Sequence, residues 1–261
     1  MPQFRPDRDK DFLLVTKRGK RVRVLKPKVF ESFNPSLLGL GNIGAAAWEV
    51  QAVAAVFDLG GFTNFCRQID PQLVVPAYLS EFLNWLFKQI REETKKDRYR
   101  EGYSLWSDLP FFTKFLGDGM LCLWDTKGMT DVAVCNIVVQ MKTICAEYEK
   151  SFYPELKKNF TDPPPRLRCG IARGAVYSVG NGTDFVGSSI NVAARLQKFN
   201  GLTFCFSRRG FPPSGFASNV LRDFSVKSVA IRGIGDEELI YVHKTELARL
   251  PENDKKLLRD P

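Results

Sequence analysis

Hydrophobic and polar positions along the chain follow two different periods, which predicts a mixture of strands and helices. A continuous apolar run reaches Asp58, and Gly60-Gly61 follow after Leu59, the pattern of a short buried strand that leads into a tight turn. Apolar residues three and four positions apart between residues 79 and 90 predict an amphipathic helix. We expect this helix to be capped at Asp70-Pro71 and to end in the charged tract Arg91–Arg100.

A Gly-Asp-Gly sequence divides two apolar segments within residues 111–125, which predicts a β-hairpin with Asp118 at its tip. A second helix is expected from about Thr130 to Lys150, and the prolines at 163–165 indicate a loop. Beyond this loop the pattern predicts a strand over 166–179, a turn over 180–184, a helix capped by Ser188 or Ser189, and strands near 202–206, 225–232 and 238–243.

The predicted elements follow the order β-α-β-β-α-β with additional strands. This order is typical of an α+β fold with a ferredoxin-like βαββαβ core. We expect one domain over residues 51–245, preceded by a basic N-terminal extension over 1–50 and followed by a charged C-terminal tail over 246–261.

Composition supports a globular protein with a full core, since 44% of the 261 residues are hydrophobic and 12% are aromatic. No apolar run is long enough for a membrane span, and the charged N-terminus does not resemble a signal peptide. The six cysteines lack C-x-x-C spacing, so we expect free thiols, a cytoplasmic location and no direct membrane contact. With His243 as the single histidine, a histidine-based triad or zinc cluster is not expected.

The net charge of +9 is concentrated in Lys17–Lys28, where basic and aliphatic residues alternate as in an edge strand or hairpin. Such charge protects an exposed strand from aggregation. A nucleic-acid-binding arm is the alternative, but neither interleaved aromatic residues nor zinc-finger spacing supports it.

Candidate chemistry is concentrated at the ends of two predicted strands. Asp58 ends the first strand and Asp118 lies at the hairpin tip, so the two carboxylates suit a pair of divalent ions, Mg²⁺ or Mn²⁺. The glycine turn after Asp58 leaves backbone N–H groups available to an anion. Together these features are typical of a metal and triphosphate site.

Four motifs occur in a fixed order along the chain: FDLGGFT, KFLGDGM, GIARGAV and DFVGSSINVAARL. Together they resemble the catalytic domain of the class III nucleotidyl cyclases, over roughly Ala52 to Lys244. The resemblance implies the class III cyclase fold and the conversion of a nucleoside triphosphate (NTP) to its 3′,5′-cyclic monophosphate and pyrophosphate.

The resemblance also implies residue roles. Asp58, Asp118 and the Leu59 carbonyl match the ligands of two divalent metal ions, and Gly60, Gly61, Phe62 and Arg232 match phosphate-binding positions. Lys114 and Asp184 match the base-recognising pair, and Asn191 and Arg195 match the pair that orients the ribose and stabilises the transition state. Arg173 stands where family members carry a small residue or threonine, and either an approach to the phosphates or an ion pair fits it.

In this family one subunit supplies the metal ligands and the other the remaining site residues, so the resemblance implies a homodimer with shared active sites. A Lys/Asp pair resembles the adenylyl cyclases, yet its hydrogen bonds fit adenine, cytosine and uracil alike. Residues 39–87 resemble the Pycsar pyrimidine cyclases of bacterial antiphage defence, which implies UTP as the favoured substrate and a separate cyclic-nucleotide-sensing effector protein. The bulky Phe115 and Phe185 are expected to narrow the base pocket.

Alternative functions stay open at this point. A cytidylate or adenylate cyclase in ordinary signalling would use the same residues. A non-catalytic dimer that binds nucleotides or nucleic acid through the basic N-terminus is the alternative outside the enzymes. A diguanylate-type cyclase is disfavoured, because GGFT replaces the acidic turn of that family.

Overall fold

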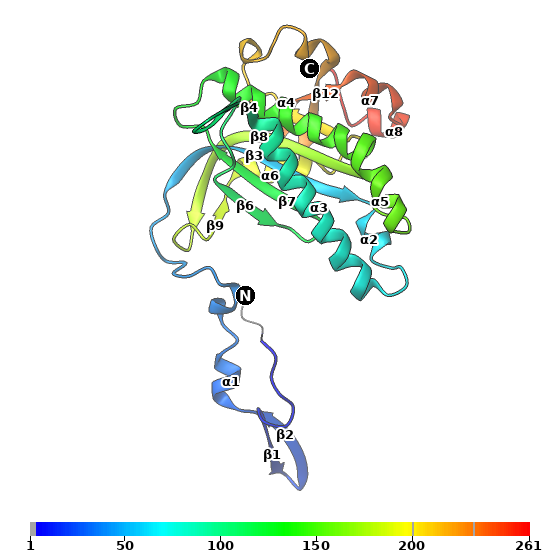
Figure 1. The fold of residues 1–261 in the computed structure, drawn as a ribbon. Coiled ribbons are helices and arrows are strands. Elements are labelled where there is room, and N and C mark those ends of the chain that lie inside the picture. Colours follow the sequence, from blue (N-terminus) through cyan, green and yellow to red (C-terminus); the bar gives the residue numbers. More distant parts are fainter. Residues whose placement is uncertain (1–3, 200, 232) are drawn as a thin grey trace. The chain divides into compact units, whose positions relative to one another are not determined.

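A computed structural model describes residues 4–199, 201–231 and 233–261 (Figure 1). The chain forms two compact units: one holds the residues up to Glu49 together with Tyr177–Val186, and the other holds Val50–Val176 and the residues from Gly187 onward. The helices are α1 (Pro27–Glu31), α2 (Phe62–Phe65), α3 (Pro71–Thr94), α4 (Asp131–Glu147), α5 (Tyr153–Asn159), α6 (Ser188–Leu196), α7 (Lys244–Arg249) and α8 (Glu252–Lys255). The strands are β1 (Phe12–Lys17), β2 (Lys20–Leu25), β3 (Glu49–Gly60), β4 (Lys95–Tyr99), β5 (Gly102–Leu105), β6 (Phe112–Phe115), β7 (Gly119–Asp125), β8 (Arg166–Val179), β9 (Asp184–Val186), β10 (Phe204–Ser207), β11 (Phe224–Ile231) and β12 (Gly235–His243).

The main sheet follows the order β11-β12-β10-β8-β3-β7-β6, and β9 pairs with the end of β8. Strands β8 and β10 are parallel, whereas β3, β6 and β7 form antiparallel pairs. The mixed sheet and its helices confirm the predicted α+β class.

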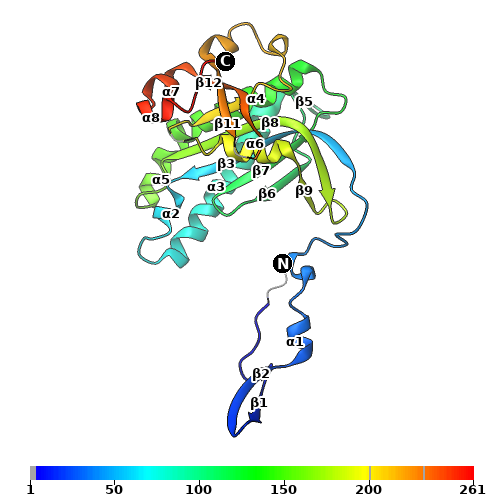
Figure 2. The same ribbon diagram turned by 180° about the vertical axis from the view of Figure 1, so that it is seen from behind.

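The two faces of the sheet have different roles. Because side chains alternate along a strand, Val53, Ala55 and Phe57 of β3 face the core that α3 and α4 complete, while Val56 and Asp58 face the other side. Figure 1 shows α3 and α4 in front of the sheet, and Figure 2 shows α6 on its opposite face. The face that carries Asp58 is therefore the one that α6 covers.

Helix α3 begins at the predicted position, although its cap differs from the prediction. Asp70 adopts a left-handed conformation (φ 53°), and its side chain makes no capping hydrogen bond. Its buried stripe includes Phe82, Leu86 and Ile90, whereas Phe87 is 41% exposed. The tract after it is a second hairpin, β4–β5, which the sequence did not predict because its side chains are mostly exposed.

The helix cap at Ser188 or Ser189 is also wrong. The N-cap of α6 is Gly187, which has no side chain to accept a capping hydrogen bond. The buried hydroxyl of Ser189 has no partner among the described residues. A Cβ atom at Gly187 would lie 2.6 Å from the Ala175 carbonyl oxygen, so the close approach to β8 requires glycine here. Strands β10, β11 and β12 confirm the three predicted C-terminal strands.

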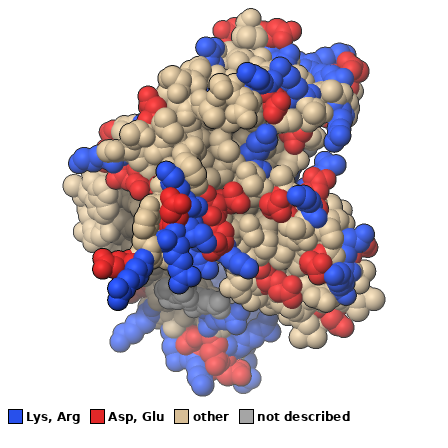
Figure 3. All heavy atoms as spheres, turned by 45° about the horizontal axis from the view of Figure 1, so that its top comes forward, with Lys and Arg blue, Asp and Glu red and all other residues tan. Residues whose placement is uncertain are grey.

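The basic segment forms the antiparallel hairpin β1–β2, as its alternation predicted. Residues 1–28 contain ten Lys and Arg against three Asp, or +7 of the net +9, so the rest of the chain carries only +2. On the face in Figure 3, basic and acidic side chains lie interspersed.

All six cysteines are free. Within the described ranges, no helix combines the length and the apolar character that a membrane crossing requires.

Candidate active site

Asp58 and Asp118 lie side by side at the end of the β3–β7 pair. Asp58 is opposite Gly119 in the antiparallel register, and the next amide, that of Leu59, donates to the Asp118 carbonyl over 2.8 Å. The glycines around Asp118 are required: Gly117 has a φ of 101°, and a Cβ atom at Gly119 would overlap the Phe57 carbonyl. The backbone therefore fixes two carboxylates at one edge of the sheet.

The glycine turn follows directly. Gly61 has a φ of 94° and is the N-cap of α2, which begins at Phe62. A Cβ atom at Gly61 would lie 3.3 Å from Pro165, whereas Gly60 has no positive φ and packs beside Arg166. The first turn of a helix leaves its N–H groups without intrahelical partners, so this turn can donate hydrogen bonds to phosphate oxygens.

Arg168 is a site residue that the sequence analysis missed. Its Nε donates to Asp58 Oδ2 over 3.0 Å, and one terminal guanidinium nitrogen bonds the same oxygen. The pair is largely buried, with the side chains of Arg168 and Asp58 exposed by 25% and 13%. No signal in the local sequence connects residues 110 positions apart. Alternation along β8 would have placed Arg168 on the same sheet face as Gly170, which packs on α6.

Cys66, the C-cap of α2, lies close to Asp118. Burial raises the pKa of its thiol, and the negative charge of Asp118 adds to the rise.

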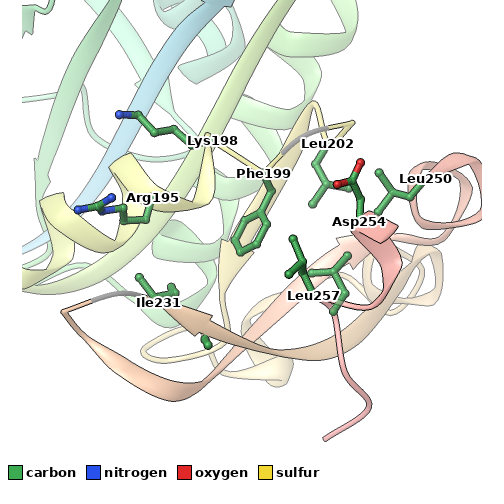
Figure 4. A pocket seen from close by; sticks show the side chains of 10 residues that line it. Arg195, Lys198, Phe199, Leu202, Ile231, Leu250, Asp254 and Leu257 are labelled. Carbon is green, nitrogen blue, oxygen red and sulfur yellow. The ribbon is translucent and has the colours of Figure 1, made fainter. Parts of the chain in front are cut away.

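Helix α6 presents Asn191 and Arg195 on one exposed face, one turn apart, while Val192, Ala193 and Leu196 are buried. The buried side lies directly on β8, because a Cβ atom at Gly170 would overlap the Ala193 carbonyl. Arg195 also lines a cavity of about 260 Å³ between α6, β11 and the C-terminal helices. Figure 4 shows Arg195 and Lys198 on one side of it and Leu250, Asp254 and Leu257 on the other.

The predicted base-reading residues lie in different units. Lys114 pairs with Leu121, which pairs with Val56, so Lys114 is on the sheet face of Asp58. Asp184 belongs to the first unit, where its carboxylate accepts the Phe185 amide over 2.9 Å.

Phe115 and Phe185, which are expected to narrow the base pocket, each follow a base-reading residue directly in their strand. Alternation along β6 directs Phe115 to the face opposite Lys114. Phe185 is 7% exposed and packs edge-on against Trp48 with ring centroids 6.4 Å apart. Neither ring therefore lies on the side of its base-reading neighbour.

Two other arginines were singled out in the sequence. Arg232 lies outside the described residues. Arg173 donates to the Gly210 carbonyl over 2.9 Å and to the Thr126 hydroxyl over 3.3 Å, so it ties β8 to two loops. These contacts give the unusual arginine a structural role.

Carboxylate and carbonyl oxygens are the donors that Mg²⁺ and Mn²⁺ prefer. Among the described residues, no group of three or more His, Cys, Asp and Glu side chains could hold a metal. Asp58, Asp118 and the Leu59 carbonyl instead suit an ion that is bound by one or two carboxylates, with substrate phosphates as its remaining ligands.

Comparison with known proteins identifies the fold. No family model matches the sequence, and no curated protein sequence is detectably similar to it. Among solved structures, the adenylyl cyclase CyaB from P. aeruginosa superposes with a TM-score of 0.52 at 16% identity, over 76% of this chain and 96% of that one. The fold is that of the class III nucleotidyl cyclase catalytic domains. The expectation from the four motifs is thus confirmed at the level of fold.

Two further structures are similar at lower scores. One is the catalytic core of a rhodopsin-guanylyl cyclase with converted specificity in complex with ATPαS, with a TM-score of 0.49 and 16% identity over 76% of this chain and 98% of that one. The other is the guanylate cyclase domain from Catenaria anguillulae in complex with GTP, with a TM-score of 0.47 and 14% identity over 75% and 97%.

Proposed function

We propose that this protein is a nucleotidyl cyclase that converts an NTP to its 3′,5′-cyclic monophosphate and pyrophosphate. The observation that carries the proposal is the register of β3 against β7, which holds Asp58 beside Asp118 next to a glycine turn on a class III cyclase fold. A phosphate-accepting turn beside paired carboxylates is the arrangement that metal-assisted phosphoryl transfer requires.

Each residue has a physical role in this reaction. Asp58, Asp118 and the Leu59 carbonyl would hold two divalent ions. When bound, such ions lower the pKa of the ribose 3′-OH and neutralise charge at the α-phosphate. The amides at Gly60, Gly61 and Phe62 would hold the triphosphate in line for attack.

Arg168 is suited to two tasks. Both of its hydrogen bonds end on Asp58 Oδ2, which orients the carboxylate and leaves Oδ1 for a metal ion. Its charge also lies beside the turn that would hold the phosphates, because a Cβ atom at Gly60 would lie 3.7 Å from its Nε.

Asn191 and Arg195 would act on the substrate of the partner subunit. Their exposed position on one face of α6 lets them reach a neighbouring chain. A guanidinium is always charged and delocalised, so Arg195 suits the charge that develops on the transferring phosphoryl group. We infer a homodimer in which each site combines residues of both chains.

For the substrate we propose UTP, within a role in bacterial antiphage defence and with a separate effector protein that senses the cyclic nucleotide. The resemblance of residues 39–87 to the Pycsar cyclases supports this choice. The Lys114 and Asp184 pair fits uracil through O4 and N3–H.

The test is incubation of the pure full-length chain with each of the four NTPs and Mn²⁺, followed by mass spectrometry of the products. We expect cUMP as the main product, and none from Asp58→Ala or Asp118→Ala. A product list without any 3′,5′-cyclic nucleotide would overturn the cyclase proposal. Cyclic AMP as the sole product would overturn only the choice of UTP.

A further inference from the structure

The turn between β8 and β9 leads directly into Asp184, the residue that we assign to the base. Three successive residues of this turn, Gly180, Asn181 and Gly182, have positive φ angles of 56°, 61° and 83°. Left-handed backbone persists only where surrounding contacts hold it, above all at a residue other than glycine such as Asn181. The contacts that hold this turn therefore also decide where Asp184 lies.

The segment that precedes β3 lies against this turn within the same compact unit. The Trp48 amide donates to the Ser178 hydroxyl over 3.0 Å, and the Trp48 carbonyl accepts the Ser178 amide over 3.1 Å. Ser178 is 5% exposed, so water competes little for these two bonds. They fix the segment to the end of β8, just ahead of the turn.

The Leu40 carbonyl contacts the turn itself. It accepts the Thr183 hydroxyl over 2.8 Å, the shortest of three contacts of that hydroxyl, since the Gly180 and Val179 carbonyl oxygens lie 2.9 and 3.3 Å away. A Cβ atom at Gly180 would overlap the Leu40 carbonyl oxygen, so glycine is required for this close approach of two backbones. Leu40 thus holds the turn at Thr183, the residue directly before Asp184.

The Trp48 side chain contacts residues on both sides of Asp184 in the sequence. Its ring lies edge-on to Phe185, with centroids 6.4 Å apart, and a Cβ atom at Gly182 would lie 2.7 Å from its Cη2 atom. Phe185 is 7% exposed, whereas Trp48 is 48% exposed. Because Trp48 is half-exposed, its truncation should leave the main core intact.

We propose that Trp48 and Thr183 are positioning residues for base selection. Asp184 lies between two anchored neighbours, Thr183 through its hydroxyl and Phe185 through its contact with Trp48. A carboxylate that reads a base must be held within about 0.5 Å of the productive geometry. The segment before β3 therefore takes part in the choice of substrate. This inference rests on the proposed cyclase function, because Asp184 is assigned to the base only there.

The test is the kinetics of Trp48→Ala and Thr183→Val with each of the four NTPs and Mn²⁺. We expect KM for the preferred NTP to rise about tenfold in each variant with kcat nearly unchanged, since a base contact is made equally before and during the reaction. The rates with the four NTPs should also become more alike. Trp48→Phe and Thr183→Ser keep an aromatic ring and a hydroxyl and should retain the original KM and order of substrates.

Two controls separate positioning from a loss of stability. Trp106→Ala removes an indole of similar exposure (49%) outside the proposed site and should change neither KM nor the order of substrates. In a chain that already carries Asp184→Ala, the further change Trp48→Ala should leave KM where it is, because Trp48 acts through that carboxylate.

The outcomes distinguish this inference from the cyclase proposal. An active Trp48→Ala variant with the original KM and order of substrates would overturn the positioning role, and so would a fall in kcat alone. A further rise of KM in the Asp184→Ala chain would overturn it as well. If the original chain forms no cyclic nucleotide, the cyclase proposal itself fails, and the base-reading role of Asp184 fails with it.

Discussion

The guanidinium of Arg168 bonds Asp58 through two nitrogens that share the single oxygen Oδ2. The other carboxylate oxygen, Oδ1, accepts no hydrogen bond within the described residues and remains available on the face that α6 covers. Two bonds to one oxygen fix the plane of a carboxylate more firmly than one bond does. Arg168 therefore orients the carboxylate that we assign to a metal ion.

We expect Arg168→Ala to lower Mn²⁺ affinity and cyclase activity by about 10–100-fold, the usual effect of removing a group that orients a metal ligand. Calorimetric Mn²⁺ titration and product formation measure the two quantities. Arg166→Ala is the matched control for Mn²⁺ affinity, since Arg166 is exposed two residues earlier in β8 and bonds neither carboxylate within the described residues. Unchanged Mn²⁺ affinity in folded Arg168→Ala would contradict the orienting role.

Local patterns in the sequence were sufficient for the elements that present the site. The apolar run before Asp58 and the Gly-Asp-Gly turn each contain a complete signal within a few residues, and the structure has a strand and a hairpin there. The apolar spacing over residues 79–90 likewise predicted the buried stripe of α3, although the apolar Phe87 within these residues is exposed. These elements were predictable because their burial follows the strand or helix period.

Contacts between distant segments were not predictable in the same way. Arg168 pairs with Asp58 across neighbouring strands, and no pattern in a single sequence gives that pairing. Asp70 and Ser189 have the side chains of helix caps, but tertiary context gives them other conformations or surroundings. The β4–β5 hairpin lacks apolar alternation because both strands are largely solvated.

Shared active sites predict complementation between inactive variants. Asp118→Ala and Arg195→Ala should each be inactive, and an equal mixture should recover about a quarter of the original activity. Half of the dimers in the mixture are mixed dimers, and each of these has one intact site of two. Activity is measured by product formation, and differently tagged chains report the exchange of subunits. Mixed dimers without activity would show that the site is not divided between chains in this way.

The base-reading pair predicts a change of substrate. Replacing Lys114 by Glu and Asp184 by Cys together should favour GTP over UTP, since a carboxylate accepts the N1–H and N2–H groups of guanine whereas lysine can only donate. Rates with all four NTPs measure the change. Lys127→Glu makes the same charge change as Lys114→Glu, but at an exposed position outside the proposed site, and serves as the control. An unaltered order of substrates in the double variant would mean that these two residues do not read the base.

Gly170 and Gly174 give a matched pair for the packing of α6 on β8. A Cβ atom at Gly170 would overlap the Ala193 carbonyl and lie 2.5 Å from the Gln197 amide nitrogen, whereas one at Gly174 would make an ordinary 3.5 Å contact with Ser189 Cβ. Gly170→Ala should therefore lower the free energy of unfolding by about 1–3 kcal/mol. It should also reduce activity, because α6 carries Asn191 and Arg195 and small displacements of such groups slow a reaction. Gly174→Ala should stay within about 0.5 kcal/mol of the original chain and keep its activity. Denaturant unfolding and product formation measure both variants, and equal behaviour of the two would contradict the packing of α6 on β8 at Gly170.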